Sequence, residues 1–116
     1  MEPSSKLKVT ATLAALLVAG LPAASGAEEL FTLNLTARDG KFHPETLEVP
    51  AGRKFKLVIR NEGPGAEEFE SLELKKEKVL APGATSFLVF APLKPGIYKF
   101  FGEFHPATAK GQIVAK

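Results

Sequence analysis

Residues 30–36 read LFTLNLT, and this stretch sets the fold class because apolar and polar side chains alternate along it. In an extended chain, successive side chains point to opposite sides, so its apolar side chains share one side: Phe31, Leu33 and Leu35. A period of two is typical of a half-buried β-strand. The Asp39-Gly40 pair that follows is a turn signal, so the sequence predicts a strand that ends in a tight turn.

The rest of the chain repeats this pattern of short extended segments separated by turns. Further strands are predicted at 46–49, 55–61, 69–74, 87–90, 97–101 and 112–115. Residues 75–78, which read KKEK, are expected to form a solvated turn. About seven short strands with turn signals about every 8–12 residues predict an all-β fold, a Greek-key β-sandwich.

The composition excludes several classes of protein. The 116-residue chain has no cysteine, and its only methionine is Met1. Zinc-ribbon, iron–sulfur, disulfide-stapled and thiol-catalytic proteins are therefore excluded. The formal net charge is only +2, with both signs mixed along the chain. A nucleic-acid partner is not expected, because phosphate binding needs clustered lysine and arginine.

Residues 1–27 are predicted to be a signal peptide. Two lysines precede the apolar run 13–19, and small residues follow it up to Ala27. The run is too short to cross a membrane, which needs about 20 residues. We therefore expect cleavage near Ala27, a periplasmic protein with no direct membrane insertion, and a single domain over residues 28–116.

Four segments of the remaining chain together resemble the cupredoxin family. They are FHPETLEVPAG at 42–52, the strand 55–61 that ends in Asn, LAPGATSF at 80–87 and PGIYKF at 95–100. Their order and spacing are similar to those of cupredoxins over essentially all of residues 30–116. The resemblance implies a cupredoxin-like β-sandwich.

The same resemblance identifies positions that correspond to the copper ligands of the family. Blue-copper sites use two histidines, a cysteine and usually an axial methionine. The corresponding positions here are Gly102 for the cysteine, His105 for the second histidine, Glu67 or Glu68 for the first histidine, and Ala109 or Lys110 for the methionine. Because the chain has no thiolate, a blue-copper site is impossible.

A different kind of metal site is predicted from the carboxylates and the imidazole that remain. The candidate ligands are His105, Glu103, Glu67, Glu68, Glu70 and His43. Oxygen and nitrogen donors of this kind suit Cu(II), Fe(II), Mn(II) or Zn(II). The fold that the resemblance implies brings residues 67–70 and 103–105 to one end of the sandwich.

Strand alternation divides the acidic residues of 67–70 but does not choose between them. Glu68 and Glu70 point to one side and Phe69 to the other, so Glu67 shares the side of Phe69. Which of the three glutamates faces a metal stays open. His43 is explained more simply as a solvated turn residue. Glutamates are mostly exposed, so surface charge is one explanation of these three. Three carboxylates within four residues repel one another, however, and a cation relieves that repulsion, so at least one of them is expected to be a ligand.

A narrower resemblance concerns residues 67–83 and 92–116. These segments look like the small periplasmic cupredoxin-like component of bacterial ferrous-iron uptake systems. The resemblance implies copper as Cu(II), with iron as a second metal, a P19-like periplasmic protein and an inner-membrane iron permease as partners, and a ferroxidase-like role before transport.

The hypothesis built on this resemblance places Cu(II) at His105 and Glu103 and Fe(II) at Glu67–Glu70. Cu(II) would take one electron from Fe(II), and oxygen or a partner would take it onward. Two alternatives stay open: a metal carrier without redox chemistry, and a structural or interaction domain that has lost the metal.

Overall fold

The computed structural model describes residues 30–116, which form β-strands and connecting turns without a helix. The predicted signal peptide, residues 1–27, lies outside the described residues. The strands are β1 Phe31–Arg38, β2 Lys41–His43, β3 Thr46–Val49, β4 Phe55–Asn61, β5 Glu67–Ser71, β6 Lys76–Leu80, β7 Thr85–Phe90, β8 Gly96–Gly102 and β9 Lys110–Ala115. In this part of the chain no helix is long and apolar enough to cross a membrane.

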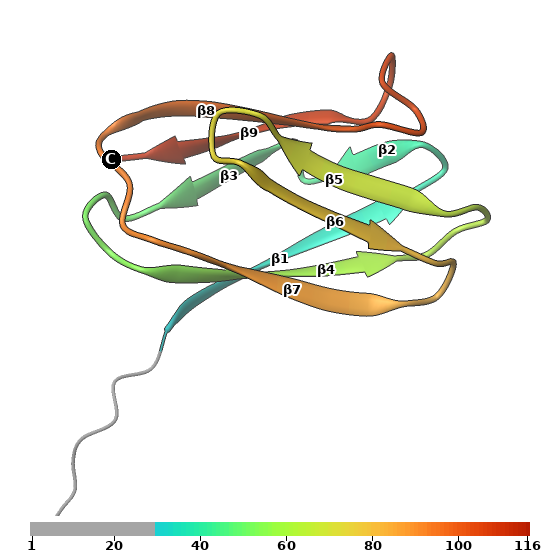
Figure 1. The fold of residues 1–116 in the computed structure, drawn as a ribbon, viewed down its shortest axis with the longest axis horizontal. Helices are drawn as coiled ribbons and strands as arrows, with labels where there is room; N and C mark the ends of the chain where they lie inside the picture. The colour runs from blue at the N-terminus through green and yellow to red at the C-terminus, as the bar shows by residue number, and fades with distance from the viewer. Residues whose placement is uncertain (1–29) are drawn as a thin grey trace, which may run out of the picture.

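The strands form two sheets that pack face to face (Figure 1). One sheet has the order β2-β1-β4-β7, and the other has the order β3-β9-β8-β5-β6. Two neighbouring pairs, β1 with β4 and β3 with β9, are parallel, and the other pairs are antiparallel. The prediction of an all-β sandwich is confirmed, with nine described strands rather than about seven.

The core between the sheets is built largely from phenylalanine. Strand alternation points five of the nine phenylalanines inward, where each is at most 2% exposed: Phe42, Phe55, Phe69, Phe90 and Phe100. The Phe55 and Phe90 rings stack with centroids 4.7 Å apart, while Phe42 meets Phe100 edge-on at 5.4 Å. Each fully buried large side chain contributes about 1.5–3 kcal/mol, so these rings supply much of the stability.

The turn between β1 and β2 is the one that the Asp-Gly signal predicts. Arg38 pairs with Lys41, which leaves Asp39 and Gly40 as a two-residue loop, and both have positive φ angles of 54° and 73°. Two consecutive positive φ angles are characteristic of a type I′ hairpin turn, for which Asp-Gly is a preferred pair. The turn brings Gly40 to the end of the sandwich where the candidate site lies.

The predicted turn at residues 75–78 is wrong. Residues 76–80 form β6, and the chain reverses at Leu72–Lys75, with Lys75 at φ 55°. The hydroxyl of Ser71 begins this turn by accepting a hydrogen bond from the Leu74 amide at 3.4 Å. The charged residues 76–78 are part of a strand because β6 pairs with β5, and β6 is the edge of its sheet, where lysines keep the edge soluble.

Three connecting segments meet at one end of the sandwich. The Asp39 amide donates to the Gly63 carbonyl at 3.0 Å, joining the β1–β2 turn to the loop after β4. The Thr108 hydroxyl donates to the Gly40 carbonyl at 2.6 Å, joining the same turn to the loop after β8. Segments 39–40, 62–66 and 103–109 are therefore held together, and the candidate site is built on them.

Candidate metal centre

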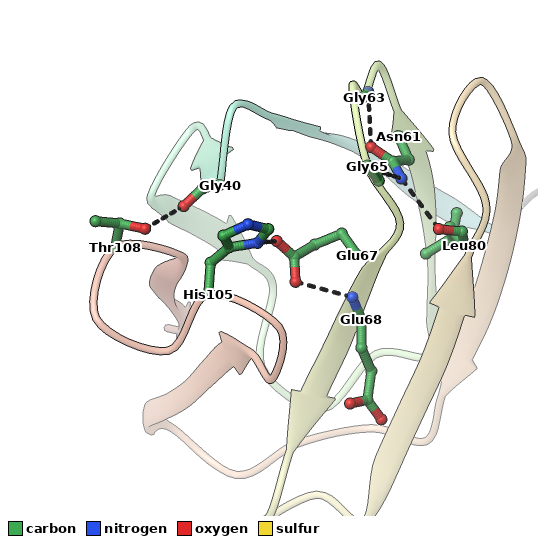
Figure 2. A network of polar contacts seen from close by, with 9 residues as sticks. All are labelled: Gly40, Asn61, Gly63, Gly65, Glu67, Glu68, Leu80, His105 and Thr108. Carbon is green, nitrogen blue, oxygen red and sulfur yellow. Dashed lines mark hydrogen bonds and ion pairs between the residues drawn. The ribbon is translucent and has the colours of Figure 1, made fainter.

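Glu67 is a buried carboxylate at the start of β5. It shares the inward side of the strand with Phe69 and Ser71, and it is 3% exposed. Its Oε2 lies 2.6 Å from Nδ1 of His105, and its Oε1 accepts a hydrogen bond of 3.0 Å from the Glu68 amide (Figure 2). The prediction that Glu67 points to the same side as Phe69 is confirmed, and the acidic segment and the imidazole do meet.

His105 is fixed by its own loop as well as by Glu67. Its amide donates to the Gly102 carbonyl at 3.1 Å, and its carbonyl accepts a hydrogen bond of 2.7 Å from the Ala109 amide. The imidazole ring lies against Gly40, where an added Cβ atom would come within 3.1 Å of the ring. The side chain remains 47% exposed, so the imidazole is held in place and still reachable from solvent.

A cavity of about 250 Å³ opens beside the Glu67–His105 pair. Its wall includes Gly40, Asn61 and residues 63–66 together with the pair itself. A small ion or molecule can therefore approach the two side chains from the end of the sandwich.

Three other carboxylates gather on the opposite side of β5. Glu68, Glu70 and Glu103 each place an oxygen within 4.8 Å of the others. The Glu68 side chain turns away from Glu67 and His105 (Figure 2). This grouping differs from the expected one: His105 is paired with Glu67, and Glu103 is grouped with Glu68 and Glu70.

The acidic group strongly affects the protonation of its members. The pKa of Glu68 is raised from 4.5 to about 7 by burial, then by a hydrogen bond and repulsion from Glu103, with repulsion from Glu70 and a contact with Glu77 adding to it. The pKa of Glu70 is also raised, by burial and by its neighbours Glu103 and Glu77. Crowded carboxylates of one sign favour a bound proton or cation.

His43 joins neither group. It is the exposed last residue of β2, next to Phe42, which points into the core. Because alternate residues of a strand face opposite sides, the imidazole of His43 is directed away from the core. It does not line the cavity beside His105, so the structure does not bring this candidate to the site.

Asn61 supports the site, although in the sequence it marks only the end of the predicted strand 55–61. It is 1% exposed, and its side-chain amide donates to the carbonyls of Gly65 and Leu80 at 2.9 and 3.0 Å. Its Oδ1 accepts a hydrogen bond of 2.8 Å from the Gly63 amide (Figure 2). The loop that leads into Glu67 is thereby fixed. The signal available in the sequence was a polar Asn at the end of a predicted strand.

Comparison with known proteins agrees with this architecture. Residues 9–115 match the Cupredoxin-like domain family. The chain belongs to this family. It is 41% identical over 87 residues to an uncharacterized protein of Rickettsia prowazekii (strain Madrid E), a match that covers 75% of this chain and 70% of the relative.

Solved cupredoxin structures share the fold at low sequence identity. A dithionite-reduced auracyanin of Roseiflexus castenholzii is 16% identical with a TM-score of 0.65, over 78% of this chain and 99% of that one. Auracyanin A of Chloroflexus aurantiacus, a blue copper protein, is 15% identical with a TM-score of 0.64, over 76% of this chain and all of that one. These likenesses establish a cupredoxin-like fold.

The residues of this cupredoxin-like chain do not fit a blue-copper centre. The position expected from the family resemblance to correspond to the copper cysteine is Gly102, and a Cβ atom added there would lie 2.6 Å from Oε1 of Glu67. A buried carboxylate therefore fills the space beside the missing thiolate. Without a thiolate, the soft donor of a blue-copper site is absent from the chain.

The Glu67–His105 pair does fit a cation that accepts mixed oxygen and nitrogen donors. Two neighbouring ligand atoms that each lie about 2.0 Å from one ion are about 2.8 Å apart in the square-planar geometry that Cu(II) prefers, and about 3.3 Å apart in a tetrahedral site. The two donor atoms here are 2.6 Å apart, so little movement is needed to replace the shared proton by an ion. An imidazole and a carboxylate suit Cu(II) and similar borderline cations better than Cu(I).

Proposed function

We propose that this cupredoxin-like protein binds a divalent metal ion, Cu(II) foremost, between Glu67 and His105. The observation that carries the proposal is the 2.6 Å contact between a buried carboxylate and an accessible imidazole. The contact lies beside an open cavity, in a chain whose fold is that of copper proteins. Glu67 supplies a fixed oxygen donor, and His105 supplies the nitrogen donor.

The site is further proposed to serve iron acquisition in the periplasm, with iron as a second metal. Two segments, residues 67–83 and 92–116, support this role through their resemblance to the cupredoxin-like component of ferrous-iron uptake systems. The proposed partners are a P19-like periplasmic protein and an inner-membrane iron permease. The basic, apolar and small-residue pattern of residues 1–27 supports export.

Two modes of action are compatible with this role, and they differ in what each requires. Handing on an ion without a change of oxidation state needs only ligands that bind and release it. Oxidation of Fe(II) to Fe(III) also needs an acceptor for one electron, such as bound Cu(II), and then dioxygen or a partner to accept that electron. We propose the carrier role as the basic function and Fe(II) oxidation as its extension.

Calorimetric titration with Cu(II) tests the binding site. We expect His105→Ala and Glu67→Gln to weaken Cu(II) binding by about tenfold or more, because the first removes the nitrogen donor and the second replaces the charged carboxylate by a neutral amide oxygen. His43→Ala is the matched control, since it removes the other histidine and should leave the affinity unchanged. Equal weak binding by the wild type and His105→Ala would instead favour a metal-free structural domain.

Anaerobic addition of Fe(II) to the Cu(II)-loaded protein separates the two modes of action. Loss of the Cu(II) EPR signal, with one Fe(III) formed for each Cu(II) reduced, is the result expected of an oxidase. An unchanged Cu(II) signal assigns the protein to the carriers. Co-elution with the P19-like protein of the same organism, in the presence and absence of metal, tests the partner.

A further inference from the structure

We propose that Glu68, Glu70 and Glu103 form a second cation site, which takes a hard divalent ion through oxygen ligands alone. The site lies on the other side of β5 from the Glu67–His105 pair. It does not depend on the proposed function, since it shares no ligand with that pair. Its ligands come from two neighbouring strands, β5 and the end of β8.

Strand register explains why these three carboxylates meet. In the antiparallel pair of β5 and β8, Phe69 lies opposite Gly102 and Glu70 lies opposite Phe101. One step further along the same register, Glu68 comes opposite Glu103, the residue that follows β8. Because Glu68 and Glu70 are two residues apart on β5, they share a face, and Glu103 meets them there.

A fourth acidic side chain makes the same surface more negative. Glu77 of β6 lies directly opposite Glu70, and like charges in that arrangement destabilise a pair of strands. Within residues 30–116, no lysine or arginine forms an ion pair with Glu68, Glu70, Glu77 or Glu103. The lysines of β6 do not neutralise this negative charge. Lys76 and Lys78 lie on the opposite face of the strand from Glu77, and the Lys76 ammonium group lies over the Phe90 ring.

The burial of Glu68 points to a ligand rather than to a solvated surface charge. Only 6% of this residue is exposed, and its carboxylate is directed into the group with oxygens of Glu70 and Glu103. Its hydrogen-bond contacts are with Glu103 and Glu77, which are themselves acids, and in the described part of the chain no lysine, arginine or histidine forms an ion pair with it. A buried charged group ordinarily has a partner, because burying a charge without one is costly. A cation is the missing partner.

The spacing and chemistry of the group define the class of ion. Three carboxylates provide up to six oxygens, and oxygen-only sites are those of Ca²⁺, Mg²⁺ and Mn²⁺. In Ca²⁺ sites, oxygens on opposite sides of the ion are about 4.6–5.2 Å apart, because each lies about 2.3–2.6 Å from it. The chosen oxygens lie within 4.8 Å of one another, so they can surround an ion of that size. Glu103 is exposed, which leaves the site open to solvent.

Mn(II) is the probe that tests this site, because its EPR signal reports free ion directly. We expect the wild type to bind one Mn(II) at neutral pH, and Glu68→Gln and Glu103→Gln to bind it about tenfold more weakly or worse. Glu45→Gln, an exposed glutamate outside the group, is the control and should bind like the wild type. Glu103→Gln changes an exposed side chain, so it keeps the test valid if Glu68→Gln folds poorly.

His105→Ala distinguishes this site from the one proposed above. Retained Mn(II) binding by this variant, together with its loss of Cu(II) binding, supports two separate sites. Loss of Mn(II) binding in His105→Ala would show one shared site and overturn the inference without harming the proposed function. The inference also fails if the wild type binds no Mn(II), or if Glu68→Gln binds it as well as the wild type does. If Ca(II) displaces the bound Mn(II), the site is a calcium site. If Ca(II) does not displace it, the site prefers manganese or iron.

Discussion

Gly102 lies where β8 passes close to the Glu67 carboxylate. An added Cβ atom would lie 2.6 Å from Oε1 of Glu67 and 2.8 Å from Cβ of Ala109, closer than real side chains approach. Only a residue without a side chain leaves the carboxylate in its place. The family's ligand cysteine and the observed Glu67–His105 contact therefore exclude each other in this chain.

The first prediction follows from this close approach. We expect Gly102→Ala to lower the free energy of unfolding by about 1–3 kcal/mol, since the added methyl group overpacks a buried site. Urea denaturation measures the change. Gly65→Ala is the matched control, because a Cβ atom added at Gly65 would have no neighbour within 4 Å and the φ angle there is not positive. A Gly102→Ala variant as stable as the control would contradict the close packing described here.

Glu68 makes stability depend on pH in an unusual direction. The folded protein raises the pKa of this carboxyl from 4.5 to about 7, so it keeps a proton that the unfolded chain has already released. The contribution of Glu68 to the free energy of unfolding should therefore be greatest below about pH 4.5 and fall as pH rises to about 7, by at most about 3 kcal/mol. Ordinary salt-bridged carboxylates act in the opposite direction.

Glu68→Gln tests that dependence, because it keeps the shape of the side chain and removes its titration. In metal-free buffer, the variant should gain stability over the wild type as the pH is raised from 5 to 7.5. Urea midpoints of both proteins across this range measure the difference. If the two curves run parallel, the burial and crowding of Glu68 do not control its protonation.

At the scale of the strand, alternation sorts residues that a sequence motif leaves together. The motif EEFES places three glutamates within four positions, yet β5 directs Glu67 inward to His105 and Glu68 and Glu70 outward to Glu103. Alternation itself was readable from the sequence. The side chains that meet each face of β5 could not be predicted from the sequence, because they depend on the register between β5 and the end of β8.

Most strands could be predicted because their apolar residues recur with a period of two. The three residues of β2 and the charged strand β6 were missed, since neither shows an apolar alternation. β2 exists because the Asp39-Gly40 turn folds it back on β1, and β6 because it pairs with β5. Both strands form because of their pairing with another strand, and this pairing cannot be recognised from the local sequence.

Asn61, the last residue of β4, holds the loop of residues 62–66 that leads to Glu67 through hydrogen bonds. Replacing it by alanine would remove two donors and one acceptor from buried or partly buried carbonyl and amide groups. We expect Asn61→Ala to lower the free energy of unfolding by about 2–3 kcal/mol, because those groups lose their partners. Asn34→Ala on the exposed face of β1 is the control and should change stability little. A loss no greater than that of the control would contradict the role of Asn61.

At the scale of the whole molecule, the sandwich separates the two candidate sites by the thickness of one strand. β5 pairs with β6 along one edge and with β8 along the other, so the strand that carries the acidic residues is held in place on both edges. A rigid strand with donors on both sides lets two ions of different preference bind close together. The mixed nitrogen and oxygen pair lies at the end of the sandwich, and the oxygen group lies on its outer face.

Every described strand and all of the described core lie within residues 31–115. This agrees with a domain that begins after the cleavage site expected near Ala27. We expect a chain of residues 28–116 to fold alone and to unfold in one cooperative transition, because a single core joins both sheets. Thermal unfolding followed by circular dichroism tests this, with the Cu(II) titration confirming that the Glu67–His105 site is intact. Mass spectrometry of the exported protein should show the same start within a residue or two. A truncated chain that stays unfolded while the full chain folds would mean that residues before 28 belong to the domain.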